Sequence, residues 1–176
     1  IRQAGVDPAW LTLEITESMF LNDTPGVLDA FRRLRDLGVG LSVDDFGTGY
    51  SNLRLLEVFP VTEIKIDRSF VAELASSQSK IVIVRAIIDL GRALGVAVVA
   101  EGVETEAQRA LLAGMGCPIG QGFLFGPPVG AGDFAAGLAQ ACPDGRPIGA
   151  VRDGSSHTTT SFGSLLALHP PASKDC

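Results

Sequence analysis

The sequence predicts an α/β fold, a partial TIM-like (β/α) barrel of parallel strands whose N-terminal strands are missing. Short β-branched runs alternate with amphipathic helical segments, at spacings of about 20 to 35 residues, and such alternation is typical of parallel strands with right-handed crossovers. Periodicity alone fits an open doubly wound sheet equally well. Polar residues at the end of each run favour the barrel, because active-site side chains collect at one end of barrel strands.

The first unit pairs a strand over residues 11–15 with a helix that begins at Thr24-Pro25. Threonine is a good N-cap, and proline suits the first helical position. The helix extends to about residue 37, where Gly38 supplies a C-terminal stop.

Two further strands are predicted over residues 39–43 and 62–66, the first ending at Asp44-Asp45 and the second at Asp67. Between them, the loop 46–50 leads to a short helix over residues 51–58. The loop glycines are also consistent with a plain turn.

A long helix capped by Ser79 is expected to end at Gly95, and the apolar run 96–100 predicts a strand buried on both faces. Glu101 follows that strand. Thr105 and Gln108 have the spacing of a capping box for a helix to residue 112. A weaker strand signal at 118–120 ends at Gln121.

The 176 residues suit one domain, which we assign to residues 1–141, followed by a Gly/Ser/Thr/Pro-rich tail over 142–176 that we expect to be disordered. We interpret the start at Ile1, which lacks an initiator Met, as a truncation. The net charge of −6 argues against DNA or RNA as a partner. Three widely spaced cysteines and the lack of a long apolar run indicate a cytoplasmic domain, although the intact protein could be tethered to the inner membrane.

Side chains at five predicted strand ends would converge on one face of a barrel. They are Glu14, Asp44, Asp45, Lys65, Asp67, Glu101 and Gln121. Several carboxylates at one mouth need cations in order to coexist as anions. Oxygen ligands without Cys or His favour Mg²⁺ or Mn²⁺ over zinc.

The adjacent pair Asp44-Asp45 could bridge two metal ions that act on a phosphodiester. Lys65 could orient a water or neutralise developing charge, and Glu101 could remove the water's proton. Each residue alone is explained as readily by a structural role, such as an ion pair of Lys65 with Asp67 or Glu63. The convergence of the strand ends favours a joint functional role.

Five motifs occur in an order that closely resembles the EAL-domain cyclic-di-GMP phosphodiesterases, over about residues 1–128. They are Leu13-Glu14-Ile15-Thr16-Glu17-Ser18, Asp44-Asp45-Phe46-Gly47-Thr48-Gly49-Tyr50-Ser51, Ile64-Lys65-Ile66-Asp67, Ala100-Glu101-Gly102-Val103-Glu104-Thr105 and Gln121-Gly122-Phe123-Leu124-Phe125-Gly126. The resemblance implies a modified TIM barrel that opens cyclic-di-GMP to linear pGpG, using two Mg²⁺ or Mn²⁺ ions and a water nucleophile.

Residue by residue, the resemblance implies that Glu14, Asp44 and Asp45 bind metal. Lys65 matches the family lysine near the catalytic water, and Glu101 matches its proposed base or metal-site carboxylate.

The resemblance assigns supporting or substrate-binding roles to Asp67, Glu104 and Gln121. Glu17 matches the glutamate that holds the loop 44–51, which in the family couples metal binding to dimer formation. A homodimer through this region and fused upstream signalling domains are therefore expected.

The sequence also departs from the family pattern. The Glu-Ala-Leu segment and a metal-binding asparagine are absent, as expected if they lie upstream of Ile1, and Pro127 replaces the usual arginine. The 176-residue fragment is therefore expected to be inactive.

Two alternative functions stay open. A degenerate domain would bind cyclic-di-GMP as a sensor without cleaving it. A lyase that uses Lys65 would need a lowered lysine pKa, whereas the surrounding carboxylates would raise it.

Overall fold

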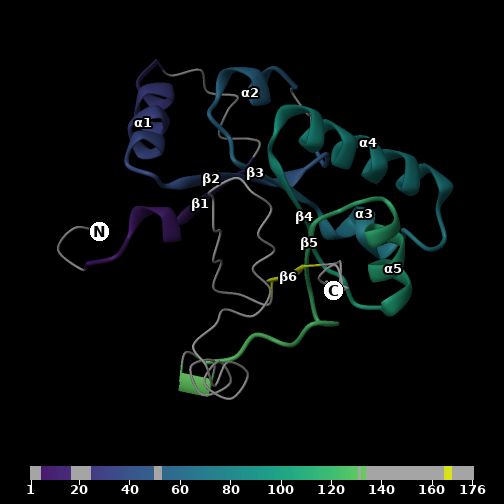
Figure 1. Ribbon diagram of the computed structural model, residues 1–176. Coiled ribbons are helices and arrows are strands. Elements are labelled where there is room, and N and C mark those ends of the chain that lie inside the picture. The colour runs from purple at the N-terminus through teal and green to yellow at the C-terminus, as the bar shows by residue number, and fades with distance from the viewer. Residues whose placement is uncertain (1–4, 17–24, 50–52, 131, 134–164, 168–176) are drawn as a thin grey trace, which may run out of the picture.

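The computed structural model describes residues 5–16, 25–49, 53–130, 132–133 and 165–167. Its elements follow a β/α alternation along the chain (Figure 1). In order they are η2 (Pro8–Trp10), β1 (Thr12–Thr16), α1 (Pro25–Asp36), β2 (Gly40–Phe46), α2 (Leu53–Val58), β3 (Glu63–Ile66), α3 (Arg68–Ala72), α4 (Gln78–Leu94), β4 (Ala97–Ala100), α5 (Glu106–Gly114), β5 (Ile119–Gln121) and β6 (Leu165–Ala167).

The strands form one sheet in the order β1-β2-β3-β4-β5-β6. The first five strands are parallel, and β6 pairs antiparallel with β5. Sequential parallel neighbours joined by helices are the repeating unit of a (β/α) barrel. The carboxyl ends of β1–β5 therefore meet at one edge, which we call the mouth.

The two faces of β2 and β3 differ in polarity. Val43, Ile64, Ile66 and Val98 point to one face, where they are almost fully buried. They pack with residues of α3, α4 and α5 in one apolar core, and in Figure 1 these helices gather near β3–β5 while α1 lies near β1 and β2. Since side chains alternate along a strand, residues between these positions face the other side.

On β1–β3 that second face carries polar groups, whereas on β4 it carries the buried Val99, which pairs with Lys65; it corresponds to the inside of the barrel. Ser42, Glu63 and Lys65 are buried there, and the register places Ser42 opposite both Glu14 and Glu63. Apolar residues thus anchor β2, β3 and β4 to the helices, while the alternate positions of β1, β2 and β3 carry polar groups toward the mouth.

The helix boundaries confirm most of the predicted caps. Gly38 and Gly95 take positive φ angles of 96° and 67° after α1 and α4, as glycine stops require. The capping box of Thr105 and Gln108 is formed at the start of α5. The predicted cap Ser79 is wrong: Ser77 is the N-cap of α4, and its hydroxyl accepts from the Lys80 amide.

Three other boundaries differ from the prediction. Strand β2 does not stop before Asp44 but continues to Phe46, and the unpredicted helix α3 follows β3 directly, with Asp67 as its N-cap. Of the tail over 142–176, only 165–167 are described, as β6; for its other residues disorder stays a prediction. Within the part described, no helix has the length and apolar character needed to cross a membrane.

Candidate active site

A β-bulge in β2 brings two adjacent aspartates to the mouth together. Val43 pairs with Ile64 and Phe46 with Ile66, so that Asp44 and Asp45 both stand opposite Lys65. Asp45 takes a φ of 54°, the single positive value of a non-glycine residue in the described ranges. A bulge residue in this left-handed conformation re-aims its side chain. Neighbours that would alternate on a regular strand therefore both reach the mouth.

Lys65 joins three strands through its ammonium group. Its Nζ lies 2.8 Å from Glu14 Oε1 on β1, 3.3 Å from Asp44 Oδ1 on β2 and 2.7 Å from Glu101 Oε1 after β4. The Lys65 side chain is only 7% exposed. The sequence alternatives of an ion pair with Asp67 or Glu63 are not the contacts observed, and the predicted residues Glu14, Asp44, Lys65 and Glu101 do come together.

A second cluster of oxygen atoms lies beside Lys65. Ligand atoms of Asp44, Asp45 and Glu101 all lie within 4.8 Å of one another. Asp44 Oδ1 is buried and accepts no hydrogen bond, although Lys65 Nζ is 3.3 Å away. A buried carboxylate oxygen with spare acceptor capacity and two neighbouring carboxylates fits a hard divalent cation. Glu14 accepts a hydrogen bond from Lys65, and its role as a metal ligand stays a prediction.

The cluster raises the pKa values of both Lys65 and Glu101, for different reasons. Burial lowers the affinity of Lys65 for its proton, but hydrogen bonds to Glu101 and Glu14 outweigh burial and raise its pKa above the ordinary value. Burial raises the pKa of Glu101, helped by the charges of Asp44 and Glu14 and opposed by Lys65. Lys65 is thus a permanent cation, and Glu101 is a carboxylate with increased affinity for a proton, as a general base needs.

Asp67 supports the outer rim of this cluster. Its carboxylate accepts from the Ser69 amide at 3.0 Å and caps α3. Burial opposes ionisation, but the hydrogen bonds from Ser69 lower the pKa of Asp67. Desolvation, the charge of Asp44 and the contact with Asp67 raise the pKa of Asp45. A bound cation would relieve this crowding of negative charge.

The remaining predicted residues are placed differently. Glu104 is exposed, and its backbone amide donates to Gln108 Oε1. Gln121 ends β5, and its carbonyl accepts from the Val103 amide at 3.0 Å. Glu17 lies outside the described residues.

Gly122 fixes the approach of this segment to the loop after β4. It has a φ of 157°, and a Cβ there would overlap the backbone N and O atoms of Val103. The glycine of the Gln-Gly pair is therefore required by packing.

Glu63 is a further acid buried beneath the site, and no functional role was predicted for it from the sequence. Ser42 Oγ donates to Glu63 Oε1 at 2.8 Å. Burial raises the pKa of Glu63, while the Ser42 hydrogen bond and the Lys65 charge oppose that rise. The sequence did contain a signal for this residue, because Glu63 lies two residues before Lys65 and therefore on the same face of the strand.

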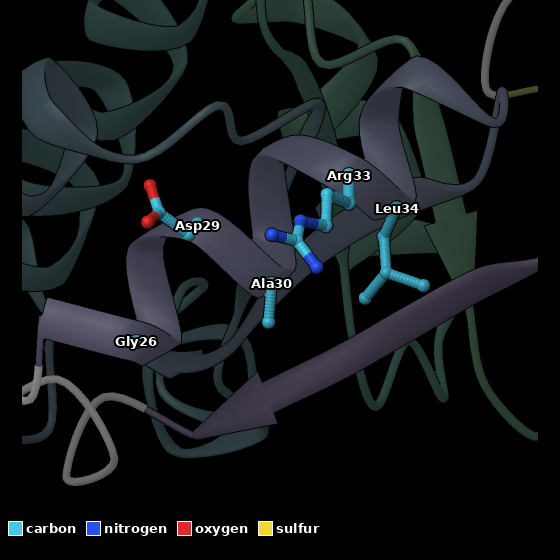
Figure 2. Close-up of a pocket in the computed structure, with 5 residues that line it drawn as sticks. All are labelled: Gly26, Asp29, Ala30, Arg33 and Leu34. Carbon is cyan, nitrogen blue, oxygen red and sulfur yellow. The ribbon is translucent and has the colours of Figure 1, made fainter.

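A shallow pocket elsewhere does not coincide with this cluster. It is lined by residues of α1 alone, namely Gly26, Asp29, Ala30, Arg33 and Leu34 (Figure 2). None of them is a predicted site residue, and we assign the pocket no catalytic role.

Comparison with known proteins decides the family. The family model described as the EAL domain matches residues 1–128. This chain belongs to the EAL domain family. The EAL chain is 48% identical, over 135 residues, to the bifunctional diguanylate cyclase/cyclic di-GMP phosphodiesterase MucR of Pseudomonas aeruginosa. The match covers 77% of this chain and 20% of MucR.

Solved EAL structures share the fold of this chain. The structure titled PaMucR phosphodiesterase in complex with c-di-GMP superposes with a TM-score of 0.70 at 47% identity, covering 75% of this chain and 53% of that one. A manganese and cyclic-di-GMP complex of Klebsiella pneumoniae BlrP1 gives a TM-score of 0.68 at 37% identity, covering 72% and 32%. The fold is thus that of the TIM-like EAL barrel, and the chain spans about half of the MucR structure.

Proposed function

We propose that the full-length protein hydrolyses cyclic-di-GMP to linear pGpG, with two Mg²⁺ or Mn²⁺ ions and water as the nucleophile. The observation that carries this proposal is the meeting of Asp44, Asp45 and Glu101 oxygens beside the Lys65 ammonium at the mouth. The similarity to MucR and the cyclic-di-GMP complex of the MucR structure support the substrate. The manganese complex of BlrP1 supports a divalent cofactor.

The residues divide the chemistry among them. Asp44 and Asp45, together with Glu14 or Glu101, would hold the metals, which supply Lewis-acid activation of the phosphodiester and the attacking water. Glu101 takes the proton from that water, because burial gives its carboxylate a raised pKa. Lys65 remains charged and stabilises negative charge on the phosphoryl oxygens. Asp67, Glu104 and Gln121, and Glu17 in the family motif, support the loops and the substrate.

The test is hydrolysis of cyclic-di-GMP by the purified full-length protein in Mg²⁺ or Mn²⁺. Glu101→Ala is expected to lower kcat by about 100-fold or more, since it removes the general base. Asp89→Ala is the matched control, because Asp89 is an exposed carboxylate of α4 whose ion-pair partner within the described residues is Arg92.

Hydrolysis that Glu101→Ala leaves unchanged would refute the catalytic assignment. Tight cyclic-di-GMP binding without hydrolysis, in metal-replete buffer, would instead identify a sensor domain.

The cellular setting is part of the same proposal. We expect a cytoplasmic EAL domain with fused signalling domains, as the name and length of MucR suggest. A homodimer through the region near residues 44–51 stays a prediction, since residues 50–52 lie outside the described ranges.

A further inference from the structure

Lys65 has more carboxylate contacts than one cation can neutralise. Three carboxylates from three strands approach its Nζ within 2.7 to 3.3 Å. Two of them are well covered, with Asp44 24% and Glu101 19% exposed, while Glu14 is 55% exposed and better screened by solvent. Among the ion pairs of the described residues, none brings a second cation to these three carboxylates.

The contact with Asp44 is incomplete in a way that leaves room for a competitor. Asp44 Oδ1 lies near Lys65 Nζ but accepts no hydrogen bond from it. The same residue, with Asp45 and Glu101, forms the oxygen cluster that fits a divalent ion. Two of the carboxylates that contact Lys65 therefore belong to both clusters.

We propose that Lys65 is the resident counter-cation of the site, which holds the β1, β2 and β4 carboxylates together before metal binds and which metal binding then partly displaces. This inference rests on the proposed metal-dependent function. It adds a structural role to Lys65 that acts in the absence of substrate: the ammonium preserves the mouth, and its positive charge weakens metal affinity. The raised pKa of Lys65 agrees with a cation held at all working pH values.

The test compares Lys65→Met with Lys80→Met in the full-length protein. Lys80 lies over the Phe70 ring, 4.5 Å from its centroid, and within the described part of the chain no ion pair joins it to a mouth carboxylate. Both variants remove one positive charge, so that unspecific attraction of metal ions rises equally in both. Thermal unfolding, hydrogen exchange of peptides that contain β1–β3, and calorimetric titration with Mn²⁺ are measured without nucleotide.

In the presence of a chelator, Lys65→Met is expected to lose protection against hydrogen exchange at β1–β3. Its unfolding temperature should lie at least about 5 °C below that of wild type, because the carboxylates then repel one another. Mn²⁺ should restore most of this loss. Mn²⁺ should also bind Lys65→Met at least about tenfold more tightly than wild type, since a cation a few ångströms away is removed. Lys80→Met should show the wild-type Mn²⁺ response.

A second variant guards against a simple folding defect. Adding Glu14→Gln to Lys65→Met removes one of the repelling carboxylates and should recover part of the stability in chelator. Equal or weaker Mn²⁺ binding by Lys65→Met, or a loss that neither Mn²⁺ nor Glu14→Gln repairs, would overturn the inference. These measurements involve no hydrolysis. A protein that binds Mn²⁺ as expected but cleaves no cyclic-di-GMP would therefore refute the proposed function and leave this inference intact.

Discussion

Asp45 combines a backbone requirement with a chemical one. Its φ of 54° places it in a region that Asp and Asn tolerate better than other side chains. The same conformation creates the bulge that sets both aspartates opposite Lys65. Residue identity at this position therefore affects folding and metal binding by separate routes.

Those two routes can be separated by comparing Asp45→Ala with Asp45→Gly. Both variants lack the carboxylate, and both are expected to lose Mn²⁺ affinity. Only alanine has a Cβ that disfavours the left-handed backbone, so Asp45→Ala should unfold with a free energy about 1–2 kcal/mol below Asp45→Gly. Chemical denaturation in chelator measures this difference. Equal stabilities would mean that the bulge relaxes when the carboxylate is lost.

Glu63 predicts a pH dependence of stability. Its folded-state pKa is raised above the ordinary value of 4.5, with burial as the largest cause. An acid with a raised folded pKa stabilises the fold below its unfolded pKa, and this contribution is lost as the pH rises through the folded pKa. Glu63→Gln can still accept the Ser42 hydrogen bond, so the variant should gain stability relative to wild type as pH rises from below 4.5 to neutrality.

Thermal unfolding across that pH range measures the effect, with the exposed Glu73→Gln as control. A Glu63→Gln variant that is less stable than wild type at neutral pH would show that the ionised carboxylate, through its attraction to Lys65, stabilises the barrel interior.

At the level of elements, two helix glycines should respond in opposite ways to alanine. Gly91 faces β4 from α4, where a Cβ would overlap Val98 Cγ2 and lie 3.1 Å from Val96 O. Gly114 at the end of α5 has open space around the same position. Gly91→Ala should lower the free energy of unfolding by about 1–3 kcal/mol through overpacking. Gly114→Ala should raise it by up to about 1 kcal/mol through helix propensity.

Denaturant titration of both variants checks this pair. Similar gains from both would show that α4 can move away from β4, contrary to the close packing at Gly91.

The order of strands and helices was predictable because each unit carries its own local signals. Buried β-branched runs and glycine stops such as Gly95 lie next to one another in sequence. The bulge at Asp45 was not predictable, since it depends on the register between β2 and β3, which no local pattern encodes. Ser77 and Ser79 are both acceptable caps by residue type, and the helix begins after the first of them.

For the site, the positions of the strand ends predicted that the polar side chains would converge, but they did not predict which side chains would contact one another. Parallel strands must bring Glu14, Asp44, Lys65 and Glu101 to one edge, so their proximity followed from topology. Side-chain reach decides the rest: Lys65 contacts Glu14, Asp44 and Glu101, and Glu101 also lies with the aspartates. The roles of Glu104, Gln121 and Glu17 stay predictions.

At the scale of the whole molecule, the 176-residue chain is predicted to be a poor enzyme by itself. It spans about half of the MucR structure that it resembles, and among the described residues β1 pairs with β2 alone. A sheet edge and polar inner face left without the rest of a barrel invite association instead of catalysis. We expect cyclic-di-GMP hydrolysis at least about 100-fold below that of the full-length protein, measured at equal concentration and with Mn²⁺ present.

Robust turnover by the 176-residue chain would show that the described carboxylates suffice. Size-exclusion chromatography of the same sample distinguishes aggregation from a folded but inactive monomer.

The bulge also affects how the function of such a domain could change during evolution. Asparagine accepts the left-handed backbone nearly as well as aspartate, so one exchange at position 45 would subtract a negative charge while leaving the turn of β2 intact. Under the proposed function, a descendant with that exchange would keep its fold and lose one metal-binding carboxylate, so that hydrolysis of cyclic-di-GMP could be lost without an unfolded intermediate stage.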